Sequence, residues 1–440
     1  MIYKTTAFIV IVLLAVLNLC GQTNRQLQQM VLDDSSRLVD IFKDIHQNPE
    51  LGFMEIRTSA LIAKELKSLG YEVVTGIGKT GVVGILKNGN GPVVMYRADM
   101  DCNSVKEITG LPYASDKIVK KEDGTEVPVM HACGHDAHIT WLLGIAKIMV
   151  KLKSEWKGTL VLLAQPAEEL LQGAMAMMND NMYEKGIPVP DYLFAMHTWP
   201  SVTGTVINGM GVRSAGSDQL DVIFHGIGGH GSAPDRSKDP IVMAGTAILE
   251  YQSIISRNVP PQDVAVLTVS SIHAGTDYNI IPATLAMKLN LRWFKNETRD
   301  ILLNGIKRVN EGLAIANNLP KNLYPEIKMK GNASPLLNDS VLTRKINVSL
   351  AKVVGADNIL TNTPPIMGSE DFPFLSTGNK KAVYDYLFIG IASPQAIAKA
   401  GAEGKQYPFY HHTADYEVDL SSIPLGTVIG VVSLLEIFKR

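Results

Sequence analysis

Four short, apolar segments do most to restrict the fold of this chain. They are too short for helices and too uniformly apolar for a sheet that has one face in water. They are GVVGIL (81–86), VVMYR (93–97), TLVLLA (159–164) and YLFAM (192–196). An amphipathic stretch from His138 to Leu152 lies between two of them and predicts a helix. The pattern predicts an α/β protein whose sheet is covered by helices on both faces.

Length and composition agree with a large globular protein. The chain has 440 residues, which predicts two or three domains, and 46% of them are apolar. The formal net charge is −2, and no run of lysine or arginine stands out. This charge argues against nucleic acid or an anionic membrane surface as the main partner.

The first 22 residues differ from the rest of the chain. Lys4 precedes an apolar run from Ala7 to Leu17, and small or polar residues continue to Gln22. A cationic start and a short apolar run are typical of a secretory signal peptide, so residues 1–22 predict export and cleavage. Lipidation at Cys20 is the alternative, and a membrane becomes a partner only in that case.

A second pattern begins near Gly211. The segments at 220–225, 265–272 and 284–294 read as strands, and those at 240–256 and 298–317 read as helices. This β-α-β-β-α order predicts a small two-layer α+β domain inserted in the larger one. Helices at 27–46, 58–69, 336–354 and 423–438, with a strand at 386–391, are expected to complete the larger domain.

Polar side chains of ligand type directly follow three of the four apolar strands. VVMYR leads to Asp99 and Asp101, TLVLLA leads to Glu168 and Glu169, and YLFAM leads to His197. Because sites in α/β sheets are built at the carboxyl ends of the strands, we expect these side chains to converge.

The stretch MHACGHDAH (130–138) adds three histidines and a cysteine. Cys133 and His135 are two positions apart, which would put them on different faces of a helix, so we expect them in the turn before one. A helix N-terminus favours the thiolate form of cysteine, which is the form that binds metal. His131 and His138 are expected to support the site. A disulfide with Cys102 is the alternative use of the thiol.

Together these residues contain more carboxylate and imidazole than one closed structural zinc site needs. They suit two divalent ions, which activate water at neutral pH and stabilise the oxyanion of a hydrolysis. One of the adjacent glutamates can bind metal while the other stays free as general base. A thiolate ligand favours Zn²⁺, whereas carboxylates and histidines also suit Mn²⁺ or Co²⁺.

A series of motifs runs in order from about Leu38 almost to Arg440: HQNPELGF, RTSALIAKELKSLGYEV, GKTGVVGIL, RADMD, MHACGHDAH, QPAEE, AMHTWP, GGHGSAP, NIIPATL, MGSEDF and YHHTADYEVD. The series resembles the aminoacylase/carboxypeptidase-G metallopeptidase family, in the branch of hippurate hydrolases and plant indole-acetyl-amino-acid hydrolases. The resemblance implies a zinc-peptidase-like catalytic domain at 23–211 and 326–440, with a mixed, mostly parallel sheet flanked by helices. It implies a two-layer lid or dimerisation domain at 212–325, and hence a homodimer.

The resemblance also implies a role for each candidate residue. Glu168 would be the general base, and Asp101 would orient a metal-bound histidine. Asp99 takes the position at which relatives outside this branch have a histidine ligand. By its spacing to YEVD, the C-terminal ligand would be His412 rather than His411. The five metal ligands would then be Cys133, which bridges the two ions, with His135, Glu169, His197 and His412.

Three further roles fall in the inserted domain. His230 of GGHG would polarise the scissile carbonyl, often in the active site of the neighbouring subunit. Asn279 and Arg292 would hold the carboxylate or carbonyl of the substrate. The chain departs from the family where CNS (102–104) replaces Ala-Leu-Pro, which adds a second thiol. We predict that Cys102 and Cys133 are both reduced in the metal-loaded enzyme.

The expected function is therefore hydrolysis of N-acyl amino acids or small peptides that carry a free carboxylate. Glu168 would take a proton from the attacking water and give it to the leaving amine. Two other classes of function compete with this one. A thiol nucleophile formed by Cys133 and His135 is not favoured by their spacing, because such pairs meet in space. A solute-binding or scaffold protein that has kept the fold would leave the filled ligand positions without a role.

Overall fold

The computed structural model describes residues 25–379 and 381–439. The predicted signal peptide at 1–22, with Cys20, lies outside these residues. Within them, no helix is both long and apolar enough to cross a membrane.

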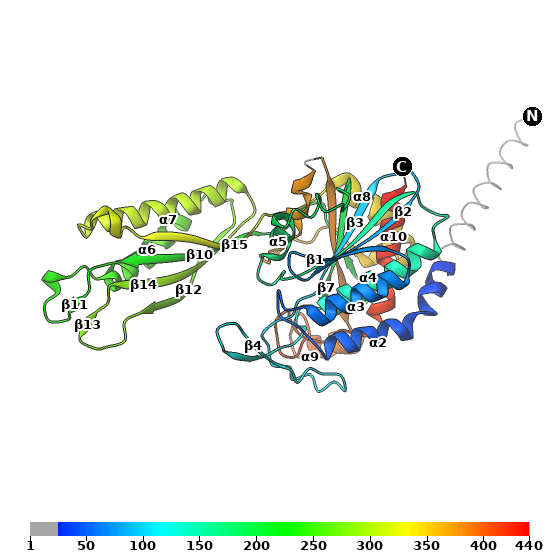
Figure 1. Cartoon of the computed structure of the whole chain (residues 1–440), viewed down its shortest axis with the longest axis horizontal. Helices are drawn as coiled ribbons and strands as arrows, with labels where there is room; N and C mark the ends of the chain where they lie inside the picture. The colour runs from blue at the N-terminus through cyan, green and yellow to red at the C-terminus, as the bar shows by residue number, and fades with distance from the viewer. Residues whose placement is uncertain (1–24, 380, 440) are drawn as a thin grey trace, which may run out of the picture.

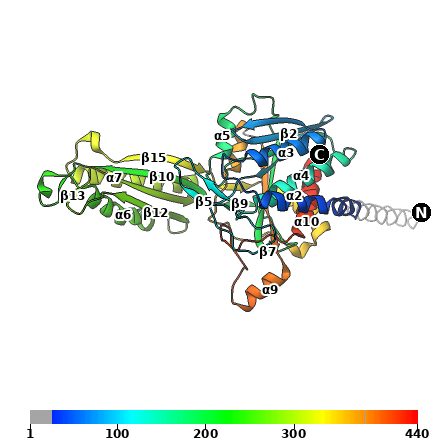
Figure 2. The same cartoon turned by 60° about the horizontal axis from the view of Figure 1, so that its bottom comes forward.

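The chain forms a large body and an elongated smaller one, which extends from it in both views (Figures 1 and 2). The large body contains an eight-stranded sheet in the order β1-β2-β6-β3-β7-β18-β8-β17. The four middle strands run parallel to one another, whereas β1, β2 and β8 introduce antiparallel pairs. In that order the strands are Glu72–Ile77, Gly81–Asn88, Gly158–Gln165, Val93–Asp99, Tyr192–Val202, Val383–Ala392, Val206–Ile207 and Ile359–Leu360.

Side chains of the middle strands alternate between two apolar cores, one on each face of the sheet. In β3, Val94 and Tyr96 belong to one core and Met95 belongs to the other. The first core is closed by α2 (Ser35–His46), α3 (Ile56–Ser68), α4 (His135–Lys151), α8 (Ser340–Val354) and α10 (Ser422–Phe438). The second core is closed by α5 (Gly173–Asn179) and the 3₁₀ helix η4 (Phe372–Gly378). The predicted α/β class, with helices on both faces, is confirmed.

The inserted domain, defined here as β10 to β15, has its own sheet and its own core. Its strands lie in the order β12-β14-β10-β15 and are antiparallel throughout. Two helices, α6 and α7, pack on one face. A short pair of strands, β11 and β13, forms the tip farthest from the large body (Figure 1). The bounds are β10 Gly216–His225, β11 Gly229–His230, α6 Pro240–Arg257, β12 Ala265–Ala274, β13 Ile280–Ile281, β14 Thr284–Trp293, α7 Asn296–Ala316 and β15 Glu326–Ala333.

The two bodies are joined where the chain enters and leaves the inserted domain. β9 (Gly211–Ser214) precedes β10 and pairs with β16 (Leu336–Asn338), which follows β15. The shorter elements are the hairpin β4 (Ile118–Lys120) and β5 (Glu126–Pro128), the helix α9 (Pro394–Ala402), and the 3₁₀ helices η1 (Pro234–Arg236), η2 (Lys321–Leu323) and η3 (Ala356–Asn358).

Three sequence expectations differ from the structure. The inserted domain was expected to end at Pro325, but β15 continues its sheet beyond that residue, and the alternation of polar and apolar residues at 326–330 was the available signal for this strand. The helix expected at 336–354 begins only at Ser340, where the Asp339 carboxylate accepts two backbone N–H groups, and β16 precedes it. The helix expected at 27–46 is interrupted by a turn at 33–34.

Candidate metal centre

The candidate ligands meet at the carboxyl edge of the parallel strands. Cys133 precedes α4, His135 is the first residue of that helix, Glu169 follows β6, and His197 lies in β7. His412 comes from the segment before α10. One ligand atom each from Cys133, Glu169 and His412 lies within 4.8 Å of the others, and the same holds for His135, Glu168 and Glu169.

Distances between the ligand atoms leave room for ions among them. Cys133 Sγ lies 3.6 Å from His197 Nε2. Glu169 Oε1 lies 3.2 Å from His412 Nε2 and 3.8 Å from His135 Nε2. The structure thus brings together all five predicted ligands, although they span 280 positions of the sequence from Cys133 to His412, both included.

The residues present fit divalent metal. The Nε2 atom of His135 and the Oε1 atom of Glu169 are buried and make no hydrogen bond within the described part of the chain, so a cation would supply the missing partner. The Nδ1–H of His197 donates to the Thr198 carbonyl at 2.8 Å, which leaves the Nε2 lone pair free on the side of Cys133. The mixed sulfur, nitrogen and oxygen donors suit the metals predicted from the sequence.

Electrostatics at the centre also favour a cation. Burial raises the pKa of the Cys133 thiol, and the neighbouring carboxylates of Glu169 and Glu168 raise it further. Burial lowers the pKa of His135, but the carboxylates of Asp99 and Asp101 outweigh it and raise that pKa to about 10. Negative charge of this density is stabilised by bound divalent ions.

Asp101 contacts both His135 and the turn that carries Glu168 and Glu169. Its Oδ1 atom lies 3.3 Å from His135 Nδ1. The same carboxylate accepts the backbone N–H groups of Glu168 at 3.1 Å and Glu169 at 3.0 Å. The turn is held in a rarely populated conformation, because Ala167 and Leu171 both have positive φ. The geometry fits the orienting role that the resemblance implies for Asp101.

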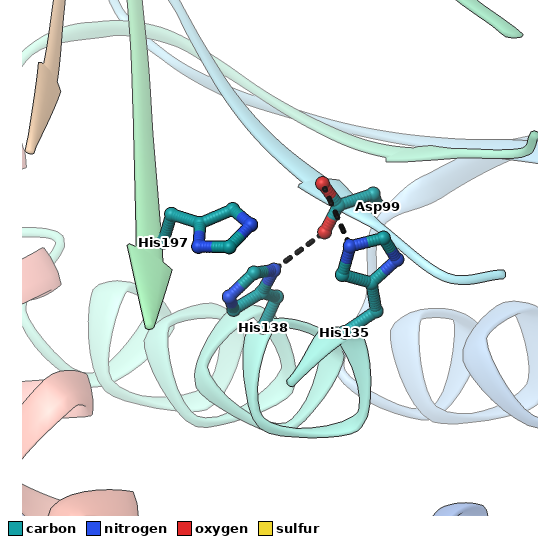
Figure 3. Close-up of side chains that lie close together, drawn as sticks. All are labelled: Asp99, His135, His138 and His197. Atoms are coloured by element: carbon teal, nitrogen blue, oxygen red, sulfur yellow. Dashed lines mark hydrogen bonds and ion pairs between the residues drawn. The ribbon is translucent and has the colours of Figure 1, made fainter. Parts of the chain in front are cut away.

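Asp99 and His138 lie beside His135 and His197, and dashed lines join Asp99 to His138 and to His135 (Figure 3). Asp99 accepts hydrogen bonds from His138 Nδ1 at 2.5 Å and from Arg97 at 2.6 Å. The other nitrogen of His138 accepts the N–H of Thr198 at 2.9 Å. Burial lowers the pKa of His138 to about 3, so the ring is neutral and has no nitrogen left for metal. The predicted supporting place of His138 fits this geometry. His131 is also buried, and neither of its nitrogens has a hydrogen-bond partner among the described residues.

Glu168, the predicted general base, lies beside two candidate metal ligands. It is buried beside the candidate ligands and faces a second group of carboxylates, since one oxygen each of Glu168, Glu370 and Asp371 lies within 4.8 Å of the others. Burial raises the pKa of Glu168, and the charge of Glu370 raises it further. Such a carboxyl group holds protons more tightly than a solvated one, which suits proton transfer.

A cavity of about 240 Å³ opens beside these residues. Its polar wall includes Arg292 from β14, which donates a hydrogen bond of 2.5 Å to Ser369 Oγ. Its apolar wall consists of Leu171, Trp199, Leu336, Ile366 and Phe388. Both bodies therefore contribute to the cavity, and the inserted domain supplies its arginine.

His230 and Asn279 lie elsewhere. His230 belongs to β11 at the tip of the inserted domain, and the Asn279 carbonyl accepts the N–H of Gly231 beside it. Figure 1 shows this tip at the opposite end of the chain from the large body. The structure thus separates these two residues from the candidate metal centre of their own chain. Cys102 and Cys133 are both free thiols, so no disulfide engages Cys133 among the described residues.

The sequence patterns predicted no role for five residues that surround the candidate ligands. Arg97, Ser369, Glu370 and Asp371 are buried or line the cavity, and Thr198 forms hydrogen bonds with two candidate ligands, Cys133 and His197. RADMD and MGSEDF contain four of these five residues, so the motifs themselves were the available signal.

Comparisons with known proteins agree with this geometry. Residues 95–413 match the model of peptidase family M20/M25/M40. The chain is 41% identical to hippurate hydrolase of Campylobacter jejuni, over 81% of this chain and 89% of that protein. It is 35% identical to N-acetyl-L-cysteine deacetylase of Bacillus subtilis, over 77% of both chains. A crystal structure described as a dinuclear metal-binding peptidase of the M20 family, from Bacillus subtilis, superimposes with a TM-score of 0.71 at 25% identity, covering 92% of this chain and 98% of that one.

The matched segment contains all five candidate ligands and Glu168. The chain belongs to peptidase family M20/M25/M40 and is a metal-dependent peptidase or amidohydrolase of that family.

Proposed function

We propose that the protein hydrolyses the amide bond of N-acyl amino acids, or of small peptides with a free carboxylate. The observation that carries the proposal is the position of Glu168, which is buried between the candidate ligands and the cavity that contains Arg292. A base, a cationic anchor and an apolar wall are the groups that such a substrate requires.

Divalent ions held by Cys133, His135, Glu169, His197 and His412 would activate water and stabilise the negative charge that develops on the carbonyl oxygen. We propose Zn²⁺ or Mn²⁺, with Co²⁺ as a further candidate, because sulfur, nitrogen and oxygen donors are all present. Glu168 takes a proton from the attacking water and delivers it to the nitrogen of the leaving amine.

Arg292 binds the substrate's carboxylate, and the apolar wall receives the acyl group or the amino-acid side chain. The arginine is suited to this task because its planar guanidinium group matches a carboxylate geometrically. Its hydrogen bond to Ser369 already directs the side chain into the cavity. The names of the relatives, hippurate hydrolase and N-acetyl-L-cysteine deacetylase, support a substrate of this class.

His230 and Asn279 act on the active site of a second copy in this proposal. Their position at the tip of the inserted domain supports such an arrangement, because a homodimer formed through that domain can bring the tip to the partner's cleft. Export by the segment at 1–22 is part of the same proposal and rests on the sequence pattern alone.

The thiol nucleophile is the weaker mechanism. A nucleophilic cysteine needs a lowered pKa, whereas burial and the adjacent carboxylates raise the pKa of Cys133. Only a bound cation makes a thiolate favourable at this place.

The test combines a substrate panel with metal analysis. N-acetyl, N-benzoyl and N-indoleacetyl amino acids and short dipeptides are offered to the parent protein, to Glu168→Gln and to Glu169→Gln, with metal content measured in each. We expect Glu168→Gln to lose at least about 100-fold in kcat and to keep its metal, since general-base catalysis contributes this much or more. Glu169→Gln is expected to lose metal and activity together. Glu168→Gln with parental kcat would contradict the assignment of the base.

A further inference from the structure

Thr198 connects three segments that surround the candidate metal centre. It follows His197 in β7, and its side chain is fully buried. Its hydroxyl donates a hydrogen bond of 2.8 Å to the carbonyl oxygen of Cys133 and accepts one of 2.7 Å from the hydroxyl of Tyr416. The loop before α4, strand β7 and the C-terminal segment are therefore joined by one chain of hydroxyl groups.

The backbone of the same residue contacts the histidines. Its N–H donates to Nε2 of His138 at 2.9 Å. Its carbonyl oxygen accepts from Nδ1 of His197 at 2.8 Å and from Nε2 of His411 at 3.1 Å. Thr198 thus fixes the tautomer of His197 through its carbonyl and the position of Cys133 through its hydroxyl.

The loop before α4, strand β7 and the C-terminal segment are closely packed around Thr198. Gly134, between Cys133 and His135, has a φ of +81°, and a Cβ atom there would lie 2.5 Å from Thr198 Oγ1 and 2.7 Å from the Tyr416 hydroxyl oxygen. The hydroxyl chain therefore packs directly against the backbone that carries two candidate ligands. A shift of either hydroxyl is transmitted to that backbone.

We infer that Thr198, assisted by Tyr416, is a positioning residue that sets the separation of Cys133 and His197 in the metal centre. The inference rests on the proposed function, since it takes these two residues as ligands. Removal of the Thr198 hydroxyl leaves the Cys133 carbonyl and the Tyr416 hydroxyl buried without their partners. The loop with Cys133 is then free to move relative to β7, and the centre loses its fixed geometry.

The test measures metal binding rather than turnover. Thr198→Val removes the hydroxyl at nearly constant shape, Thr198→Ser keeps it, and Tyr416→Phe removes the outer end of the chain. Thr427→Val is the matched control, because Thr427 is also fully buried and its hydroxyl donates to a helical carbonyl, that of Ile423 in α10. Each variant is stripped of metal, and its zinc dissociation constant is measured by chelator competition. The thiolate-to-metal absorption band is recorded with Co²⁺.

We expect Thr198→Val to bind zinc about 10-fold more weakly and to shift the cobalt–thiolate band, as losses of supporting hydrogen bonds at metal sites do. Thr198→Ser should restore both properties, and Tyr416→Phe should change them in the same direction but less. Thr427→Val should leave both unchanged.

Parental zinc affinity and an unshifted band in Thr198→Val would overturn the inference, as would an equal effect in Thr427→Val. Should Thr198→Val not accumulate in folded form, Tyr416→Phe decides by the same two measurements. A parent protein without any cobalt–thiolate band would refute the proposed metal centre itself, and the positioning role would fall with it. Failure of the positioning role and failure of the proposed metal centre therefore give different results.

Discussion

Arg97 and Glu370, which are 273 positions apart in the sequence, form a buried two-pronged ion pair beside the candidate metal centre. The same guanidinium group also donates to Asp99 and Asp371, so one cation holds three buried carboxylates. Asp99 forms a hydrogen bond with His138, and Glu370 lies close to Glu168. The cluster around Arg97 therefore supports the buried side of the site.

Arg97→Met should destabilise the protein by about 3–5 kcal/mol, because it leaves buried carboxylates without their cation. The measurement is urea-induced unfolding of the metal-free protein. Arg37→Met is the control, since Arg37 pairs with Asp34 and Glu65 but is about one third exposed, and its loss should cost no more than about 1 kcal/mol. Equal losses in the two variants would contradict the role of Arg97.

Stability should fall at alkaline pH because of His46. Burial lowers the pKa of His46, but its hydrogen bonds to Asp136 and Glu107 outweigh burial and raise that pKa to about 9. A histidine with a raised folded-state pKa stabilises fully below its unfolded pKa of about 6.5 and loses the contribution as pH rises through about 9. The contribution is on the order of 3 kcal/mol. Denaturation of the metal-free protein between pH 6 and pH 10 should therefore show a slope that is smaller in His46→Gln, in which His135, with its pKa of about 10, still contributes in the same direction. A parental slope in that variant would show that other groups are responsible.

Arg292→Met should raise KM for N-acyl amino acids about tenfold or more and change kcat less, because it removes a charge-assisted contact to a part of the substrate that does not react. N-acyl amino-acid amides, which lack the carboxylate, are the control substrates, and their KM should stay unchanged. If both substrate classes are affected alike, Arg292 acts on the shape of the cavity and not on the carboxylate.

A mixture of two inactive variants should recover activity. His230→Ala lacks the histidine at the tip, and Glu168→Gln lacks the base, so a mixed dimer has one complete site only if the tip serves the partner's cleft. Random reassortment should then restore about a quarter of the parental activity. The mixture is refolded or co-expressed with two different affinity tags, and its kcat is compared with that of each variant alone. No recovery in an isolated mixed dimer would place the action of His230 within its own chain.

The middle of the sheet could be predicted because its strands are buried on both faces. GVVGIL, VVMYR, TLVLLA and YLFAM correspond to β2, β3, β6 and β7, and the helix predicted from His138 to Leu152 corresponds to α4, which begins three residues earlier and is buried on nearly all sides. β15 was missed, although Glu326 to Lys330 alternate between polar and apolar residues, which is a strand signal. The strand pairs with β10 at the edge of its sheet, and its first five residues are exposed.

In the candidate site, too, some features could be predicted from the sequence and others could not. Strand ends and MHACGHDAH indicated Cys133, His135, Glu169 and His197 as candidates, whereas His412 could be named only through the resemblance to the family. The hydrogen bonds of Asp99 and Thr198 could not be named, because they depend on how α4, β7 and the C-terminal segment dock. Sequence motifs indicate which side chains can bind metal. Tertiary contacts decide which histidine nitrogens already form hydrogen bonds and are therefore not free to bind it.

The position of His412 has a consequence for how the enzyme acquires its metal. The N–H of His412 donates a hydrogen bond to the carbonyl of Ala132, beside Cys133, and so attaches the C-terminal segment to the loop before α4. In the proposed metal centre, the full ligand set therefore forms only after the segment with His412 has docked beside Cys133. Affinities among divalent ions follow a fixed chemical order, so the ion that is retained depends on which metals are available where folding is completed. In the proposed centre, the metals present where this docking takes place would then help to determine the cofactor.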